Sequence, residues 1–334
     1  MTDNVCIVLT TYRNKNKLNL INYHLLFSII IPLYNKAAYI QRAVDSVLKQ
    51  TFQDFEIIVV NDGSTDGGEK LLEGYKDDRI KIISQENQGV SIARNAGIKH
   101  ARFQYIAFLD GDDYWHTSFL KITADTIEKF VDVAMIGSYY SRTELSETIG
   151  NCEVLVLKNY FSEAIHNTLF SSSSTIIRKD FFEKNEGFKP HLKIGEDLDL
   201  WFRAITFFGS AFFIKERLVF YDVGGSESSL IKKDLAVSVL TEFLKEKYLN
   251  DENNLVSLKK FKEKFILFNL FEYYLLDSNK SLIQGLLKEV GSNNWIIRVF
   301  YKLPYPFLKG FFSFPTFSKL FRNYMKFCFR YIYV

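Results

Sequence analysis

Three carboxylates stand within four residues at 110–113 (Asp-Gly-Asp-Asp), directly after the apolar run Phe103 to Leu109. Carboxylates this close repel one another unless a cation, or the hydrogen-bond donors of a ligand, sit among them. An apolar run that ends in acids also places them at the carboxyl end of a buried strand, where open α/β sheets bind ligands. Asp112 suits a divalent cation that a diphosphate also binds, and Asp110 could accept from ribose hydroxyls. A solvated acidic turn is the alternative for this segment taken by itself.

Two earlier apolar runs also end in polar residues. The run Phe27 to Ile31 is stopped by Pro32 and followed by Tyr34, an aromatic residue that could stack on a base. The next run, residues 55–60, precedes Asp62, whose carboxylate could accept from the N–H of a uracil ring. A helix N-cap with turn glycines is the alternative for Asp62.

Two charged residues near predicted helix starts could complete a site. Arg94 lies in a helix predicted over 90–100 and could reach a phosphate or a base, although a surface ion pair is the ordinary role of one helical arginine. Asp197 follows Gly195 and precedes a helix predicted over 198–208. It could be a capping acid or a general base that removes a proton from an attacking hydroxyl.

The elements that would position these residues alternate between strands and helices. Strands are predicted at 27–31, 55–60, 79–84 and 103–109, with helices at 36–50, from about 68 to 75, and at 90–100. This alternation predicts an α/β fold with βαβ units and a mostly parallel central sheet. A less regular stretch, 113–170, follows. Beyond it we expect a strand at 174–177, a helix from 179, and two short strands at 211–214 and 217–221.

Composition narrows the class of protein. The 334 residues are 47% hydrophobic and 24% charged, as in soluble globular proteins. The three cysteines lack CxxC spacing and the five histidines form no metal-binding pattern, which fits a reducing compartment without a structural zinc site. No apolar stretch approaches the ~18 residues of a membrane-spanning helix, and the first residues lack a secretory pattern. We therefore expect a cytoplasmic protein.

The C-terminal part is basic. From Gly291 to the end there are seven Lys or Arg and no Asp or Glu, while the rest carries 35 basic and 39 acidic residues, a net charge of −4. Within Phe317 to Tyr331 the apolar and basic residues separate onto two faces of a helix, which predicts an interfacial helix on an anionic membrane. Packing of its aromatic residues on the catalytic domain is the alternative. The aromatic density argues against nucleic acid as the partner.

Five ordered blocks of this sequence resemble the inverting family-2 glycosyltransferases of the bacterial envelope polysaccharide type, which have the GT-A fold. The resemblance covers roughly residues 27–222. The blocks are FSIIIPLYNK, VLKQTFQDFEIIVVNDGSTDGG, NQGVSIARNAGI, YIAFLDGDDYW and TIIRKDFFEKNEGFKPHLKIGEDLDLWFRA.

The resemblance implies a role for each matching residue. A nucleotide, usually UDP, would be held by Pro32, Tyr34, Asp62 and Arg94, with Asp110 on the ribose. The resemblance further implies that Asp112 binds Mn²⁺ or Mg²⁺ and that Asp197 is the catalytic base. It also implies that Glu196 and Trp201 lie near the acceptor. After Tyr221 the family often has a histidine-containing loop, whereas this chain has Asp-Val-Gly-Gly-Ser at 222–226, which leaves the acceptor side open.

The function that this implies is a metal-dependent, inverting transfer of sugar from a UDP-sugar to a hydroxyl of a glycan or lipid-linked acceptor. It would take place at the cytoplasmic face of the inner membrane, with the protein bound peripherally. A catalytically silent sugar-nucleotide-binding subunit that recruits a partner enzyme is the alternative. A nucleotidyltransferase would be expected to carry a Gly-rich phosphate loop after the first strand, which this chain lacks.

The expected organisation has three parts. Residues 1–26 are an N-terminal extension or a start upstream of the true domain. Residues 27–230 form the GT-A domain, with a nucleotide-binding half (27–113) and an acceptor half (114–230). Residues 231–334 form a helical region that ends in the basic aromatic tail.

Overall fold

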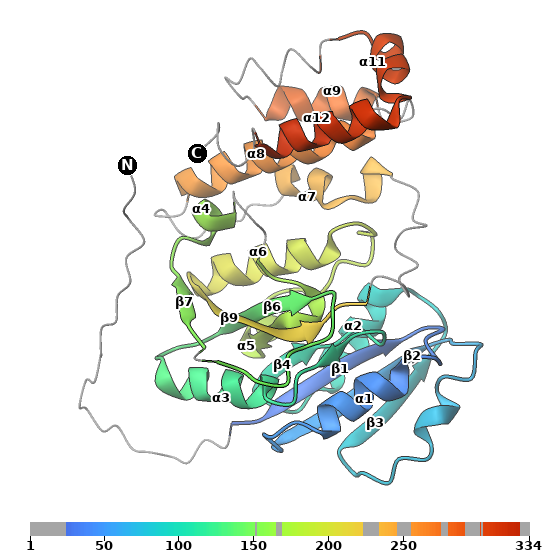
Figure 1. Cartoon of the computed structure of the whole chain (residues 1–334), viewed down its shortest axis with the longest axis vertical. Helices are drawn as coiled ribbons and strands as arrows, with labels where there is room; N and C mark the ends of the chain where they lie inside the picture. Colours follow the sequence, from blue (N-terminus) through green and yellow to red (C-terminus); the bar gives the residue numbers. More distant parts are fainter. Residues whose placement is uncertain are drawn as a thin grey trace.

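One mixed sheet lies at the centre of the computed structural model, with helices on both of its faces (Figure 1). The structure describes residues 25–150, 152–164, 169–222, 234–245, 255–274, 280–290, 301 and 303–327. Within these residues the strands are β1 (Phe27–Leu33), β2 (Phe55–Asp62), β3 (Ile80–Gln85), β4 (Tyr105–Phe108), β5 (Tyr114–Trp115), β6 (Met135–Ser141), β7 (Val154–Leu157), β8 (Thr175–Arg178) and β9 (Ala211–Phe220). Their order is β3-β2-β1-β4-β8-β6-β9-β5, and β7 pairs with β9.

The helices cover the sheet from both sides and continue beyond it. The longer ones are α1 (Ile40–Leu48), α2 (Val90–His100), α3 (Phe119–Lys129), α6 (Glu196–Phe208), α7 (Val239–Lys245), α8 (Leu255–Tyr274), α9 (Lys280–Glu289), α11 (Tyr305–Phe312) and α12 (Pro315–Phe327). Short helices are α4 (Tyr160–Ala164) and α5 (Asp180–Lys184), with 3-10 turns at Lys70–Leu72, Ser172–Ser174 and Leu235–Val237.

The continuous apolar runs form strands because both faces of the sheet are buried. Along β1, Ile30 joins the core cluster that contains residues of α2, α5 and α6, whereas Ile29 and Ile31 join the cluster that contains α1 and α3. Strand β1 lies between β2 and β4, parallel to both. The carboxyl ends of these three strands therefore meet at one edge of the sheet, as the sequence predicts.

The second half of the sheet differs from the expected pattern. The pairings β4–β8, β6–β8, β5–β9 and β7–β9 are antiparallel, so the sheet is parallel in its first half and mixed overall. The stretch 113–170 is more regular than expected, since it contains α3 and β6. The helix expected from about 68 to 75 is only a short 3-10 turn.

The two short strands expected at 211–214 and 217–221 are one continuous strand, β9. Lys215 is exposed between two buried apolar stretches, so in the sequence this polar residue looks like part of a turn. Strand β9 continues through it because the chain pairs with β6 and β7 on either side.

The C-terminal helices form a layer on the side of α6 that faces away from the sheet (Figure 1). Phe243 of α7 and Phe261 of α8 pack against Phe202 of α6, with ring centroids 5.1 and 5.2 Å away. This helical layer and the sheet domain beneath α6 therefore share one hydrophobic core. Residues 1–24 and 328–334, which include most of the expected extension and the end of the expected tail helix, lie outside the described residues. No described helix is both long and apolar enough to cross a membrane.

Candidate functional site

The 110–113 segment lies directly beyond β4, close to the end of β1. A hydrogen bond from Asp113 N to Asp110 O closes the turn, and Asp110 N donates to Ser173 Oγ. Gly111 permits a close backbone approach, because a Cβ there would lie 3.1 Å from the carbonyl oxygen of Pro32. The acids are thus held against the end of the parallel strands.

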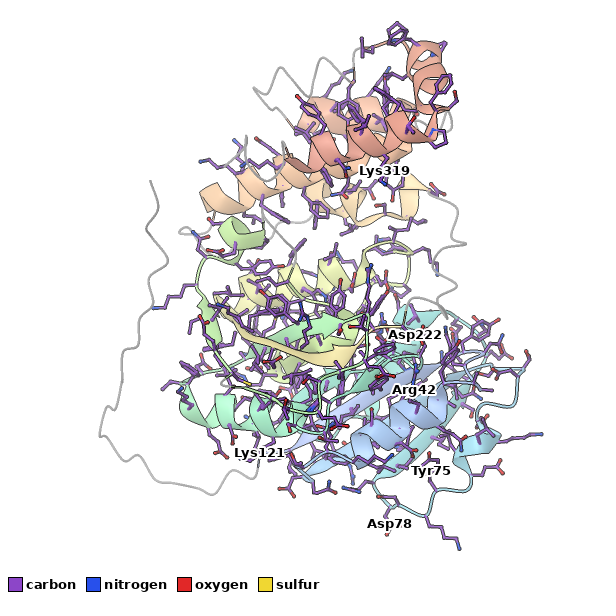
Figure 2. The ribbon with its side chains drawn as sticks, in the orientation of Figure 1. Arg42, Tyr75, Asp78, Lys121, Asp222 and Lys319 are labelled. Carbon is purple, nitrogen blue, oxygen red and sulfur yellow. The ribbon has the colours of Figure 1, made fainter. Side chains whose placement is uncertain are left out.

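Asp112 is surrounded by cationic side chains. Lys36 Nζ lies 2.7 Å from Asp112 Oδ2, and Arg42 donates to the main-chain oxygen of Asp112. Arg42 also pairs with Asp222 at 3.0 Å, which joins α1 to the residues after β9 (Figure 2). Neither Lys36 nor Arg42 was assigned a role from the sequence, although Lys36 lies only three residues beyond β1, which could have indicated it.

Asp113 is buried beside Asp110 and Asp112, and these surroundings oppose its ionisation. Its carboxylate accepts from Ser173 Oγ at 2.5 Å and from the main-chain N–H of Asp222 at 2.9 Å. Burial, together with the charges of Asp110 and Asp112, nevertheless raises its pKa to about 8. A divalent cation beside these oxygens would relieve that repulsion, so the residues present fit the expected Mn²⁺ or Mg²⁺. Across the described part of the chain, no three His, Cys, Asp or Glu residues are arranged as a complete metal site.

Asp62 is buried at the end of β2 and organises the loop before α2. Its Oδ1 accepts from Gln85 Nε2 and Gln88 N, and its Oδ2 accepts from Gly89 N at 2.8 Å. The carboxylate thus fixes the loop that leads to Arg94. Tyr34 is exposed just beyond β1, where its ring is accessible to a ligand.

Arg94 connects the two groups of acids. Its buried guanidinium contacts Asp110 Oδ1 at 2.6 Å and Glu196 Oε1 at 3.5 Å, and it lies over the Phe188 ring. Asp110 follows β4 and Glu196 begins α6, so this contact links residues that are distant in the sequence. The structure therefore brings Arg94, Asp110 and Glu196 together, as a shared site requires.

Glu196 and Asp197 form the first turn of α6, after Gly195 in a left-handed conformation with φ +77°. Burial and the charge of Asp197 raise the pKa of Glu196 to about 7. Burial also raises the pKa of Asp197, although Arg94 and the N–H of Leu198 oppose this. Asp197 keeps part of its surface accessible. A carboxylate with a raised pKa that an incoming hydroxyl can reach has the properties of a general base.

Trp201 does not join the acids at this site. Its side chain is fully buried between Phe108 and Phe188, with ring centroids 6.0 Å away in each case. It therefore belongs to the core beneath the site rather than to a surface that an acceptor could contact. The sequence shows an aromatic residue four positions after Asp197, and this spacing returns a side chain to a similar helix face but not to the same depth.

Comparisons with known proteins identify the family of this chain. The glycosyl transferase family 2 model matches residues 28–185. An uncharacterized glycosyltransferase of Rickettsia typhi is 31% identical over 237 residues, 67% of this chain and 73% of the relative. An uncharacterized glycosyltransferase of Bacillus subtilis, EpsJ, is 45% identical over 117 residues. The aligned part spans only 34% of that relative's length.

Solved structures support the fold. TarS of S. aureus in complex with UDP-GlcNAc has a TM-score of 0.61 and 20% identity, covering 80% of each chain. A mannosyltransferase of Pyrobaculum calidifontis in complex with GDP-Man and Mn²⁺ has a TM-score of 0.53 and 17% identity, covering 82% of this chain and 88% of the other. These likenesses confirm the GT-A-like fold, and together with the sequence matches they lead to one conclusion. The chain belongs to glycosyl transferase family 2.

Proposed function

We propose that this chain transfers a sugar from a UDP-sugar to a hydroxyl of a glycan or lipid-linked acceptor, with inversion at the anomeric carbon. The observation that carries the proposal is the contact of buried Arg94 with both Asp110 and Glu196. It joins Asp110, which would contact the ribose, and Glu196, the neighbour of the expected base, to one cation. The donor and the acceptor hydroxyl would meet at this point.

The donor side would be held by the ends of β1, β2 and β4. Tyr34, exposed beyond β1, would stack on the base, and Asp62, which fixes the loop before α2, would help to hold the nucleotide. Asp112 would hold Mn²⁺ or Mg²⁺, which as a Lewis acid would neutralise charge on the departing diphosphate. Lys36, 2.7 Å from Asp112, is placed to bind the same phosphates electrostatically. The complex of a fold neighbour with GDP-Man and Mn²⁺ supports divalent metal use.

Asp197 would remove the proton of the acceptor hydroxyl as the oxygen attacks the face of the sugar opposite UDP. Its raised pKa makes the carboxylate a stronger base than an exposed aspartate. A single displacement of this kind converts an α-linked donor into a β-linked product. Glu196 lies beside the base and would face the acceptor.

The first test is a thermal-shift screen of UDP-sugars with Mn²⁺, followed by measurement of UDP release. A ligand present at ~100 times its Kd stabilises the folded state by ~2.7 kcal/mol, so a bound donor should raise the melting temperature. We expect one UDP-sugar to do so and then to yield UDP when a glycan acceptor is added. Binding without UDP release from any donor would favour a catalytically silent subunit instead.

We further propose peripheral binding to the cytoplasmic face of an anionic membrane through α11 and α12. Four apolar side chains of α12 that the structure describes divide into two sets: Phe317 and Phe321 contact Phe312 of α11, whereas Leu320 and Tyr324 are exposed. Phe307 and Phe314 are exposed nearby, and so is Lys319, which Figure 2 shows in the helical layer, apart from Arg42 and Asp222. Exposed aromatic residues beside basic ones suit a lipid headgroup region.

Truncation tests this membrane proposal. Removing Phe317 onward should reduce binding to vesicles that contain anionic lipid and slow transfer to a lipid-linked acceptor, while hydrolysis of the donor by water continues. Added salt should weaken binding of the intact chain. If the truncated protein loses its cooperative melt instead, α12 is a structural cap.

A further inference from the structure

A second cluster of charges lies behind the expected base. Asp199, fully buried, accepts from Arg203 Nε at 2.8 Å and lies 3.3 Å from Lys189 Nζ. Lys189 lies equally far from Glu242, which is buried on α7, and His191 Nε2 lies 3.0 Å from the other oxygen of Glu242. Asp199 and Glu242 thus join Lys189 and Arg203 in one network of ion pairs.

This network holds the first turns of α6 through Asp199, which is three residues after Glu196, the residue that contacts Arg94. Asp199 is two residues after Asp197, so the two side chains point to different sides of the helix. Arg203 also donates to the main-chain oxygens of Glu186 and Gly187, and Asn95 exchanges two hydrogen bonds with the main chain of Phe188. The base therefore sits on a helix start whose neighbouring side chains, Glu196 and Asp199, are held by ion pairs.

The main chain adds a second link between α7 and this helix start. Lys193 N donates to Val237 O, and Val239 N donates to Ile194 O, both at 2.9 Å. A Cβ at Gly195 would lie 2.6 Å from Val239 Cγ1, so the glycine before Glu196 lets α7 approach closely. The residues around 234–245 lie beyond the match to the family model, which ends at residue 185, yet they contact the segment that presents the base.

We propose that Glu242 is a positioning residue for Asp197, acting through Lys189 and Asp199, so that the segment from Asp234 to α7 is part of the catalytic unit. This rests on the proposed function, because it takes Asp197 as the base. Small displacements matter here, since a misplacement of ~1 Å can cost ~100-fold in rate. Glu242 acts on the base and not on the donor, so it should affect kcat and not donor affinity.

The test measures UDP release by full-length variants. The donor is the UDP-sugar that the thermal-shift screen identifies. Glu242→Gln keeps the shape of the side chain and removes its charge. We expect kcat per folded molecule to fall at least tenfold, with donor KM and the melting shift caused by UDP unchanged. Glu183→Gln, an exposed glutamate on α5, is the matched control and should behave like the wild type.

Loss of one partner of a buried ion pair can unfold a protein, whereas loss of both is often tolerated. The double variant Lys189→Gln with Glu242→Gln removes one charge of each sign and leaves Asp199 paired with Arg203. We expect it to fold and to show the same loss of kcat. Unchanged kcat in a folded variant, an equal loss of donor affinity, or loss of the cooperative melt in the double variant would each overturn the positioning role. Absence of UDP release from the wild type would instead refute the proposed function.

Discussion

The two ends of the site hold their acids in different ways. At the donor end, the carboxylate of Asp112 pairs with Lys36, and that of Asp62 accepts from Gln85, Gln88 and Gly89, so the partners of these two side chains come from residues 27–113. At the base end, Glu196 contacts Arg94, and the adjacent network reaches Glu242, which is distant in the sequence. The side chains of Asp112 and Asp62 are therefore held within one part of the chain. The base end depends on contacts between distant segments, and Asp197 there keeps part of its surface accessible.

The sharpest test of the donor end is Asp112→Asn. This change removes the carboxylate charge but keeps the shape of the side chain, so we expect an intact fold and loss of all metal-dependent UDP release. Mn²⁺ binding, followed by electron paramagnetic resonance, should weaken in parallel. Full activity of this variant in the presence of a chelator would refute the metal assignment.

At the base end, Asp197→Asn should lower kcat by roughly 10²–10⁴-fold, the range for loss of general-base catalysis. The affinity for UDP, measured by calorimetry, should change little because the base acts on the acceptor. If UDP affinity falls as far as kcat, Asp197 belongs to the donor end and the comparison fails.

The raised pKa values at the base end predict how the rate depends on pH. A protonated carboxyl cannot accept a proton, so kcat should rise with pH through the raised pKa of Asp197 and then level off. Glu196→Gln removes the neighbouring negative charge and should move this rise to lower pH. An unmoved pH profile would show that the two acids do not interact.

Glu196→Gln also tests the burial of the Glu196 carboxyl, through the stability of the folded protein. The folded-state pKa of Glu196 is about 7 against an ordinary 4.5, so its ionisation reduces the free energy of unfolding as pH rises between these values. Glu196→Gln should therefore stabilise the protein at pH 8 and not at pH 4, as measured by thermal melting. Equal effects at both pH values would contradict the burial of this charge.

The smallest effect is expected for Lys36→Gln. Lys36 pairs with the carboxylate of Asp112, so its removal should strengthen binding of Mn²⁺ alone by about twofold to fivefold, the range for a partly exposed ion pair. The exposed Lys49→Gln at the end of α1 is the control. Weaker binding in Lys36→Gln would mean that the lysine supports the metal site instead of competing for it.

The sequence by itself determined the parallel half of the sheet and the place of its acids. Continuous apolar runs that end in Asp62 and Asp110 predict strands buried on both faces, and parallel strands end at one edge. The family could also be identified from the sequence, because the residues of each motif block are contiguous. The sequence predicted two short strands where the structure has the single strand β9, because pairing with neighbouring strands outweighs local polarity.

The tertiary structure alone decided which residues surround those acids. Trp201 and Asp197 are close in sequence, yet one lies in the core and the other remains accessible. Glu242 carries no local signal, since a single glutamate in a helix is ordinarily a surface residue. Its partners Lys189 and His191 lie 53 and 51 residues earlier in the sequence. Burial and charge pairing depend on such long-range packing, which no local pattern of residue types encodes.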